Sequence, residues 1–364
     1  MLSLTQAKAY EALQGFFEDN PNPFVFFGTG TSCGVDARFG MDSLRDRLLH
    51  EMPKRLNAAA EIKEWQAVNE SLKSGCDFES AMDAIKDAQV TQHVVNATAD
   101  FLGSLDKEYS YKIMCGNVSW PAIKLFKQLV DGLSASDSAL HVATTNYDLL
   151  AEYAFENAGI PYICGYIGGV CRRLQWEQAT HTVSAFQKKL VGKKQLNRVL
   201  DYQNHIRLYK VHGSLNTFKL NGEIVENNSW MYGPPLGIER VMVTPGTGKY
   251  KKLHKHRFDL LNTYDKALET HNAFIFVGFG FNDNQITNDC LSKKLKEQCC
   301  PCLIVTRDSN PRIETVLDDC ENAWLVCKSG NGTLIKNKRY TNVLLIPDKE
   351  LWNATGLATE ILGG

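Results

Sequence analysis

Short, mostly apolar runs recur along the chain, and polar or glycine-containing segments follow them. Such runs are typical of strands that are buried on both faces. Strands are predicted at residues 24–27, 140–144, 161–165, 207–211, 241–244, 273–277, 302–306 and 342–346. Helical patterns separate many of them, including one that ends near Asp19 and one over 255–270. This alternation predicts an α/β fold with a doubly wound, Rossmann-like parallel sheet.

One long segment interrupts the alternation. Residues 54–135 carry helical patterns and no convincing strand, so we expect an inserted helical subdomain there and a core made of residues 1–53 and 136–364. Asp42 is predicted to cap a helix that stops before Pro53. The polar, lysine-rich residues 172–204 are predicted to be helical and exposed. Asn221-Gly222 between two strand-like segments predicts a hairpin.

Composition and charge exclude several classes of protein. The chain has 364 residues, 44% of them hydrophobic, and a formal net charge of −1. This charge gives no basic field for nucleic acid. No apolar run reaches the roughly 20 residues of a membrane span. The N-terminus lacks a basic segment followed by an apolar core, so we expect a cytoplasmic protein.

The eleven cysteines do not form a recognisable metal motif. Cys299, Cys300 and Cys302 lie close together, but no second pair follows at a distance that zinc ribbons use. Cys164 and Cys171 are too far apart to form such a pair. We therefore expect free, mostly buried thiols, no structural zinc and no other metal site.

Four polar segments directly follow predicted strands. They are Gly28–Ser32, Thr144–Asp148, His212–Ser214 and Gly278–Asp283. Because the carboxyl ends of parallel strands lie at one edge of a sheet, these segments should converge, and ligands bind at that edge. Their convergence is stronger evidence for a site than any one of the segments.

The Gly28–Ser32 loop differs from the dinucleotide fingerprint of dehydrogenases. Its two glycines allow a sharp turn and a close approach to a pyrophosphate. However, Cys33 stands where the third glycine of that fingerprint belongs. No second strand with a terminal acidic residue follows about 20 residues later. These departures argue against hydride transfer.

The polar residues of the other loops also have ordinary interpretations. Asn146 and Asp148 could serve only as turn and capping residues. His212 could be a packed, hydrogen-bonded side chain. Three such groups on converging loops beside a phosphate-type loop favour a functional site.

The ordered set of motifs resembles the sirtuin family. Gly28-Thr-Gly-Thr-Ser32 is similar to the sirtuin Gly-Ala-Gly-x-Ser loop, and Thr144-Thr-Asn-Tyr-Asp148 to its Thr-Gln-Asn-Ile-Asp segment. His212-Gly-Ser214 resembles the His-Gly-Ser element, and Gly278-Phe-Gly-Phe281 stands where a Gly-Thr-Ser-Leu loop follows. The zinc ribbon is missing, and Gly40-Met-Asp42 replaces a Gly-x-Pro segment. With these departures, the chain resembles the sirtuin-like NADases of bacterial antiphage defence more than the protein deacylases.

The resemblance implies an NAD⁺ glycohydrolase that releases nicotinamide and ADP-ribose, with NAD⁺ as substrate and no cofactor. It implies that Asn146 holds the ribose and positions water, Asp148 receives the carboxamide, and His212 acts as base. The implied NAD⁺-binding residues are Gly28, Thr29, Gly30, Thr31, Ser32, Thr145, Gly278, Phe279, Gly280, Asp283, Thr306 and Asp308. The backbone amides of 28–31 and the Ser32 hydroxyl would bind phosphate.

The resemblance also implies a homo-oligomer that works with a separate HerA-type ATPase. No membrane or direct nucleic-acid contact is expected. The helical insertion could provide the partner surface or only a lid over the site. The alternatives are a non-catalytic NAD⁺ or ADP-ribose sensor, a protein deacylase or ADP-ribosyltransferase, and a scaffold with a vestigial site.

Overall fold

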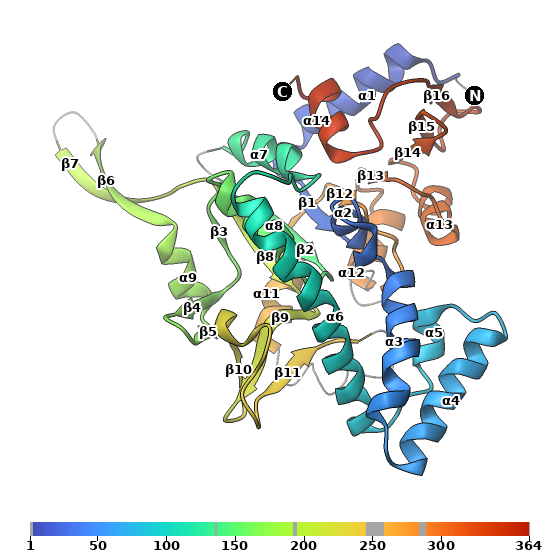
Figure 1. The fold of residues 1–364 in the computed structure, drawn as a ribbon. Helices are drawn as coiled ribbons and strands as arrows, with labels where there is room; N and C mark the ends of the chain where they lie inside the picture. The colour runs from blue at the N-terminus through green and yellow to red at the C-terminus, as the bar shows by residue number, and fades with distance from the viewer. Residues whose placement is uncertain (1–2, 135–136, 192–194, 245–257, 284–288, 364) are drawn as a thin grey trace.

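A nine-stranded sheet forms the centre of the molecule (Figure 1). The computed structural model describes residues 3–134, 137–191, 195–244, 258–283 and 289–363. The strands lie in the order β16 (Leu344–Ile346), β15 (Gly332–Asn337), β14 (Ala323–Ser329), β13 (Cys302–Thr306), β12 (Phe274–Val277), β1 (Phe24–Phe27), β2 (Ala139–Thr144), β8 (His205–Lys210) and β3 (Tyr162–Ile163). From β14 to β3 all neighbours are parallel, whereas β15 and β16 are antiparallel.

Helices cover both faces of this sheet, which confirms the predicted doubly wound α/β fold. In β1, Phe24 and Phe26 point into one apolar cluster and Val25 and Phe27 into the other, as the period of two in a strand requires. The first face packs against α11 (Phe258–Thr270), α12 (Asp289–Lys296) and α13 (Pro311–Asp319). The second face packs against α1 (Gln6–Asp19), α7 (Ile123–Asp131), α8 (Leu150–Asn157) and α14 (Ala354–Ile361).

Four helices extend from one side of the sheet and share an apolar cluster of their own. They are α3 (Met41–Arg55), α4 (Ala59–Lys73), α5 (Phe78–Met82) and α6 (Ala88–Met114). The second half of α6 packs in the main core, through Leu102 and Leu105 among others. Figure 1 shows α6 running from α3 towards α8. This long helix therefore connects the helical region to the sheet.

The helix over residues 42–49 was predicted too short. α3 begins after Gly40, which is its N-cap in place of Asp42, and it continues through Pro53 to Arg55. Proline lacks an amide hydrogen and would disrupt the middle of a helix. Here only two helical residues follow it, so a distortion at Pro53 affects little of the helix.

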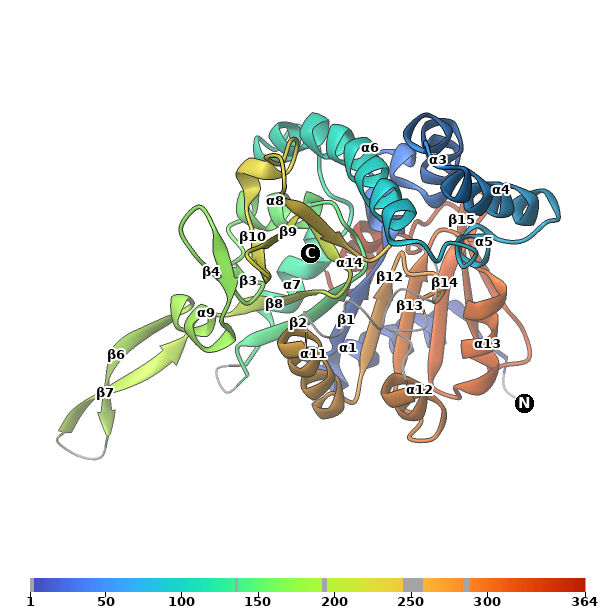
Figure 2. The same ribbon diagram turned by 90° about the horizontal axis from the view of Figure 1, so that it is seen from below.

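The prediction of a helix over residues 172–204 was wrong except at residues 176–182. This segment forms β5 (Arg172–Leu174), a short helix α9 (Trp176–Thr182) and an antiparallel hairpin of β6 (Ser184–Val191) and β7 (Gln195–Tyr202). The hairpin projects from the body in both views (Figures 1 and 2). In the sequence, Phe186 and Leu190 are four residues apart, a spacing that fits one face of a helix and one face of a strand equally well.

A second sheet of five strands lies beside the carboxyl end of β8. Its order is β11 (Glu239–Met242), β9 (Gly213–Leu220), β10 (Glu223–Glu226), β5 and β4 (Tyr166–Gly168). The hairpin predicted at Asn221-Gly222 is confirmed as the turn between β9 and β10, and both residues have a positive φ. The first residues of the predicted helix 255–270, and residues 284–288 of the segment after Asp283, lie outside the described residues.

Candidate functional site

The polar segments follow four adjacent strands at the centre of the sheet, in the order β12, β1, β2 and β8. From β1 the chain proceeds to β2 and β8 on one side, and later from β12 to β13 on the other. The boundary between β1 and β12 is therefore the topological switch point, outside which open α/β sheets bind their ligands. The segments at 28–32, 144–148, 212–214 and 278–283 all lie at this edge.

The glycine loops after β1 and β12 contact each other through their backbones. A Cβ at Gly30 would lie 2.7 Å from Gly278 Cα, and one at Gly28 would lie 2.7 Å from Gly278 O. Gly278 has a φ of +56°, which glycine adopts without strain. These glycines are therefore required for the packing of two loops, whether or not a phosphate approaches them.

Most of the amides predicted to bind phosphate already donate within the chain. Gly28 N donates to Val277 O at 3.1 Å, Gly30 N to Gly278 O at 3.0 Å, and Thr31 N to Gly28 O at 3.0 Å. The segment after Gly28 is a short helix, α2 (Thr29–Cys33), and not an open loop. In this conformation, the amides of Gly28, Gly30 and Thr31 are already used in hydrogen bonds within the chain.

Ser32, Asn146 and Asp148 form one buried hydrogen-bonded cluster. Asn146 Nδ2 donates to Ser32 Oγ at 3.0 Å and to Gly28 O at 3.1 Å, and Ser32 Oγ donates to Asp148 Oδ2 at 2.9 Å. Asn146 is only 3% exposed. Its Oδ1 is buried and has no hydrogen-bond partner among the described residues. A buried amide oxygen without a donor is costly in a folded protein, which indicates that a ligand or water supplies one.

The pKa of Asp148 is raised to about 6, chiefly because burial disfavours the charged carboxylate. The positive charge of Lys210 and the hydrogen bond from Ser32 lower this pKa, whereas the negative charges of Asp106 and Glu152 raise it. Asp148 is thus mostly ionised at neutral pH but titrates far above an ordinary aspartate.

His212 lies beside this cluster at the end of the neighbouring strand. Its Nε2 is 2.6 Å from Asp283 Oδ2, and both side chains are largely buried. The two groups form an ion pair when His212 is protonated. The imidazole also stacks on Tyr147, with ring centroids 6.4 Å apart and an interplanar angle of 29°. The structure therefore brings predicted residues from β8 and β12 into direct contact.

The remaining predicted residues are less central. Thr145 is half-buried between Thr144 and Asn146. The Phe279 side chain packs in the core against Phe26 and Phe276, so it does not face the site. Gly280 is half-buried, and its carbonyl accepts from Asn310. Thr306 and Asp308 lie at the end of β13, beyond β12, where the exposed Asp308 pairs with Arg307.

Two buried charged residues were missed by the sequence analysis. Lys210 Nζ donates to the backbone carbonyl of Asp148 and to Glu152 Oε1, both at 2.6 Å. Asp106 accepts from the backbone amide of Leu149. A lysine inside the apolar run Leu208-Tyr-Lys-Val211 was a signal for the first, because a buried ammonium requires partners. Nothing in the local pattern of α6 distinguishes Asp106.

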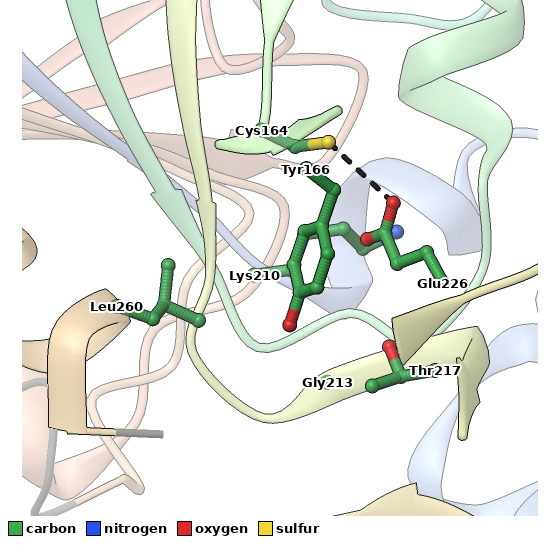
Figure 3. A pocket seen from close by; sticks show the side chains of 7 residues that line it. All are labelled: Cys164, Tyr166, Lys210, Gly213, Thr217, Glu226 and Leu260. Carbon is green, nitrogen blue, oxygen red and sulfur yellow. Dashed lines mark hydrogen bonds between the residues drawn. The ribbon is translucent and has the colours of Figure 1, made fainter. Parts of the chain in front are cut away.

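A small pocket opens next to the site on the side of the second sheet (Figure 3). Its volume is about 250 Å³ including its mouth, and it is lined by Cys164, Tyr166, Lys210, Gly213, Thr217, Glu226 and Leu260. The Glu226 carboxylate accepts from the Cys164 thiol at 3.6 Å and lies 3.3 Å from Arg172. Burial raises the pKa of Glu226 to about 7. Two polar groups of the lining, the Cys164 thiol and the Glu226 carboxylate, thus already pair with each other.

Among the described residues, no group of three or more His, Cys, Asp and Glu side chains could hold a metal ion. All eleven cysteines are free thiols. In the same part of the chain, no helix is long and apolar enough to cross a membrane.

Residues 140–308 match the family model of a SIR2-like domain. The match runs from β2 to just beyond β13 and includes Asn146, Asp148, His212 and Asp283, but not the Gly28–Ser32 loop. Over this range, which is less than half of the chain, the protein is similar to a SIR2-like domain. No curated protein matches the chain.

Solved Sir2 structures are similar to the chain over most of its length. One, described as the structural basis for the mechanism and regulation of Sir2 enzymes, has 13% identity and a TM-score of 0.41, covering 85% of this chain and 88% of its own. A Sir2 homolog–NAD complex has 12% identity and a TM-score of 0.41, covering 89% of each chain. Similarity at this level does not indicate a shared activity.

Proposed function

We propose that this protein hydrolyses NAD⁺ at its nicotinamide–ribose bond, releasing nicotinamide and ADP-ribose. The observation that carries the proposal is the buried Ser32–Asn146–Asp148 cluster at the switch point of the sheet, with the acceptor Asn146 Oδ1 still available. The match to a SIR2-like domain over residues 140–308 supports it.

The reaction suits such a site because it needs little acid catalysis. The C1′–N bond breaks with its electron pair passing to the pyridinium, so nicotinamide leaves as a neutral base. The ribose acquires oxocarbenium character, as in glycoside hydrolysis. An anionic Asp148 close by would favour this developing positive charge. Asn146 Oδ1 would accept a hydrogen bond from a ribose hydroxyl or from the attacking water.

His212 would act as the base for the attacking water. Oxygen of the water bonds to C1′ while its proton passes to the imidazole, and from there to solvent. The carboxylate of Asp283, 2.6 Å from Nε2, would stabilise the imidazolium that forms. Stacking on Tyr147 would fix the plane of the ring.

The test is to incubate the purified chain with NAD⁺ and to quantify nicotinamide and ADP-ribose by chromatography. Wild type should release both in equal amounts. Asn146→Ala and His212→Ala should each release them at least about 100-fold more slowly while remaining folded. The matched control is His50→Ala, since His50 is exposed on α3, and it should retain full activity.

Each other result identifies an alternative. Undiminished cleavage in both Asn146→Ala and His212→Ala would refute the assignment of the site. NAD⁺ binding without release would favour a sensor. Nicotinamide release that requires an acylated or acceptor protein would favour a deacylase or an ADP-ribosyltransferase.

We also infer, from the sequence resemblance, that cleavage depletes NAD⁺ during antiphage defence, in a homo-oligomer assisted by a HerA-type ATPase. Helices α3 to α5 are a candidate contact surface, since they form a lobe with its own apolar cluster. Mixing the chain with such an ATPase and measuring both the mass of the assembly and NAD⁺ cleavage tests this inference. An unchanged mass and an unchanged rate would refute it.

A further inference from the structure

The peptide group between Asp148 and Leu149 is held at both ends by buried charged side chains. Lys210 Nζ donates to its carbonyl, Asp148 O, at 2.6 Å. Asp106 Oδ2 accepts from its amide, Leu149 N, at 2.8 Å. The two side chains come from different elements, β8 and α6, and neither belongs to the polar segments that follow the strands.

Each charged group has further partners that hold it in place. Lys210 is 6% exposed, and its ammonium also contacts Glu152 Oε1 of α8 at 2.6 Å. Asp106 is fully buried and accepts from the Tyr153 and Tyr232 hydroxyls at 2.8 and 2.9 Å. Burial raises the pKa of Asp106, whereas the hydrogen bonds from these two hydroxyls and from Leu149 N lower it.

Burying these charges is expensive. Ions moved into a protein interior lose several kcal/mol of solvation, and apolar replacements of similar volume are often more stable. An apolar core at this position would hold β8, α6 and α8 together equally well. It would not control the orientation of one peptide group.

We propose that Lys210 and Asp106 are positioning residues, which clamp the Asp148–Leu149 peptide and thereby aim the Asn146 and Asp148 side chains for cleavage of the glycosidic bond. The clamp rests on the proposed function. Rotation of this peptide would require both charged contacts to break at once. The adjoining turn, which carries Asn146 and Asp148, is fixed as a consequence.

The clamp also sets the electrostatics of Asp148. The groups that face Asp148 are Lys210 from β8, Asp106 from α6, Glu152 from α8, and the Ser32 hydroxyl and Cys33 thiol from α2. Lys210 lowers the pKa of Asp148 and Asp106 raises it. Removing one or the other charge should therefore displace the pH dependence of cleavage in opposite directions.

The experiment measures kcat and KM for nicotinamide release from NAD⁺ between pH 5 and 9, using the full chain. Lys210→Met and Asp106→Asn should each lower kcat about 10- to 100-fold, since small misplacements of reacting groups have effects of this size. KM should change less than about threefold. Lys210→Met should move the acidic limb of the kcat profile to higher pH, and Asp106→Asn should move it to lower pH.

Two further variants separate positioning from loss of structure. Lys210→Arg keeps the charge, so it should leave the acidic limb in place and retain more kcat than Lys210→Met. If Lys210→Met unfolds, Lys210→Arg still tests the positioning role, since its kcat should fall below that of wild type. Lys127→Met removes an exposed lysine that pairs with Asp131 on α7, and it should match wild type. Thermal melting of every variant identifies those that are folded.

The outcomes are distinct. An inactive wild type overturns the proposed function and the clamp together. If wild type is active, the clamp alone is overturned by folded variants with unchanged kcat, or by acidic limbs that stay in place or move in the same direction.

Discussion

At the scale of single residues, burial has made Asp148 an unusual aspartate. Its pKa of about 6 lies within the range in which enzymes work, whereas an exposed aspartate would be ionised throughout that range. Ser32 donates to it at 2.9 Å and partly offsets the effect of burial. The state of this carboxylate can therefore be followed through the pH dependence of the reaction.

The acidic limb of NAD⁺ cleavage should lie near pH 6. Asp148 loses its charge as the pH falls through about 6, so kcat should drop about tenfold per unit below that value if the carboxylate is needed. Ser32→Ala removes a hydrogen bond that lowers the pKa, and its limb should shift upward. Ser119→Ala is the control, because it removes an exposed hydroxyl that precedes α7. A wild-type kcat that stays constant down to pH 5 would show that Asp148 does not act as a carboxylate.

At the scale of elements, the contact between the loops after β1 and β12 joins the two halves of the sheet. It depends on the absence of side chains at Gly28, Gly30 and Gly278. The sequence already indicated a sharp turn at the two glycines of the first loop. It did not reveal that the two loops contact each other, because their pairing requires β12 to lie beside β1 although about 250 residues separate them in the chain.

Gly30→Ala should destabilise the fold by about 1–3 kcal/mol, since its Cβ would meet backbone atoms of Gly278 at 2.7 Å and they cannot move freely. Gly15→Ala is the matched control, because Gly15 lies inside α1 with open space around it. It should stabilise by about 0.5–1 kcal/mol, as alanine does in helices. Chemical denaturation measures both changes. Equal effects of the two substitutions would contradict the role of the contact.

The β6–β7 hairpin should be dispensable for the fold. Its strands pair only with each other in the part of the chain that the structure describes, and isolated two-stranded hairpins contribute little stability. Replacing residues 186–200 with Asn-Gly joins Ala185 and Asp201, which are opposite each other. The free energy of unfolding should change by less than about 1 kcal/mol. A large loss would show that the hairpin supports the core.

At the scale of the whole molecule, the sequence predicted the architecture well where each element is buried on both faces. The five central strands that matter most for the site, β1, β2, β8, β12 and β13, all appear where apolar runs predicted them. The edge of the sheet formed by β14, β15 and β16 was harder to predict. There β14 and β15 form an antiparallel hairpin, so no helix separates them and the alternation of strands and helices is lost. The candidate site residues could be proposed from the sequence because they directly follow strands. The role of Lys210 and Asp106 could not, since their partners are known only from the packing.

A buried histidine on β2, His141, should make the stability of the fold sensitive to acid. The ring centroid of His141 lies 4.7 Å from that of His271, and His141 Nδ1 lies 3.0 Å from Tyr209 Oη. Burial and the neighbouring positive charges lower the pKa of His141 to about 3. The unfolded chain binds a proton near pH 6.5, so the stability that neutral His141 contributes is complete above 6.5 and is lost between 6.5 and about 3.

At pH 5, this loss should amount to about 2 kcal/mol, which is 1.36 kcal/mol for each of 1.5 pH units. The raised pKa values of Asp148 and Glu226 act in the opposite direction, because their protonation stabilises the folded state. The quantity to measure is therefore the difference in slope between wild type and His141→Phe, from urea denaturation at pH 5 to 8. The free energy of unfolding of His141→Phe should depend less on pH by about this amount, although loss of the hydrogen bond between His141 and Tyr209 lowers its stability at pH 8. Parallel curves would mean that His141 is protonated equally in the folded and unfolded chains.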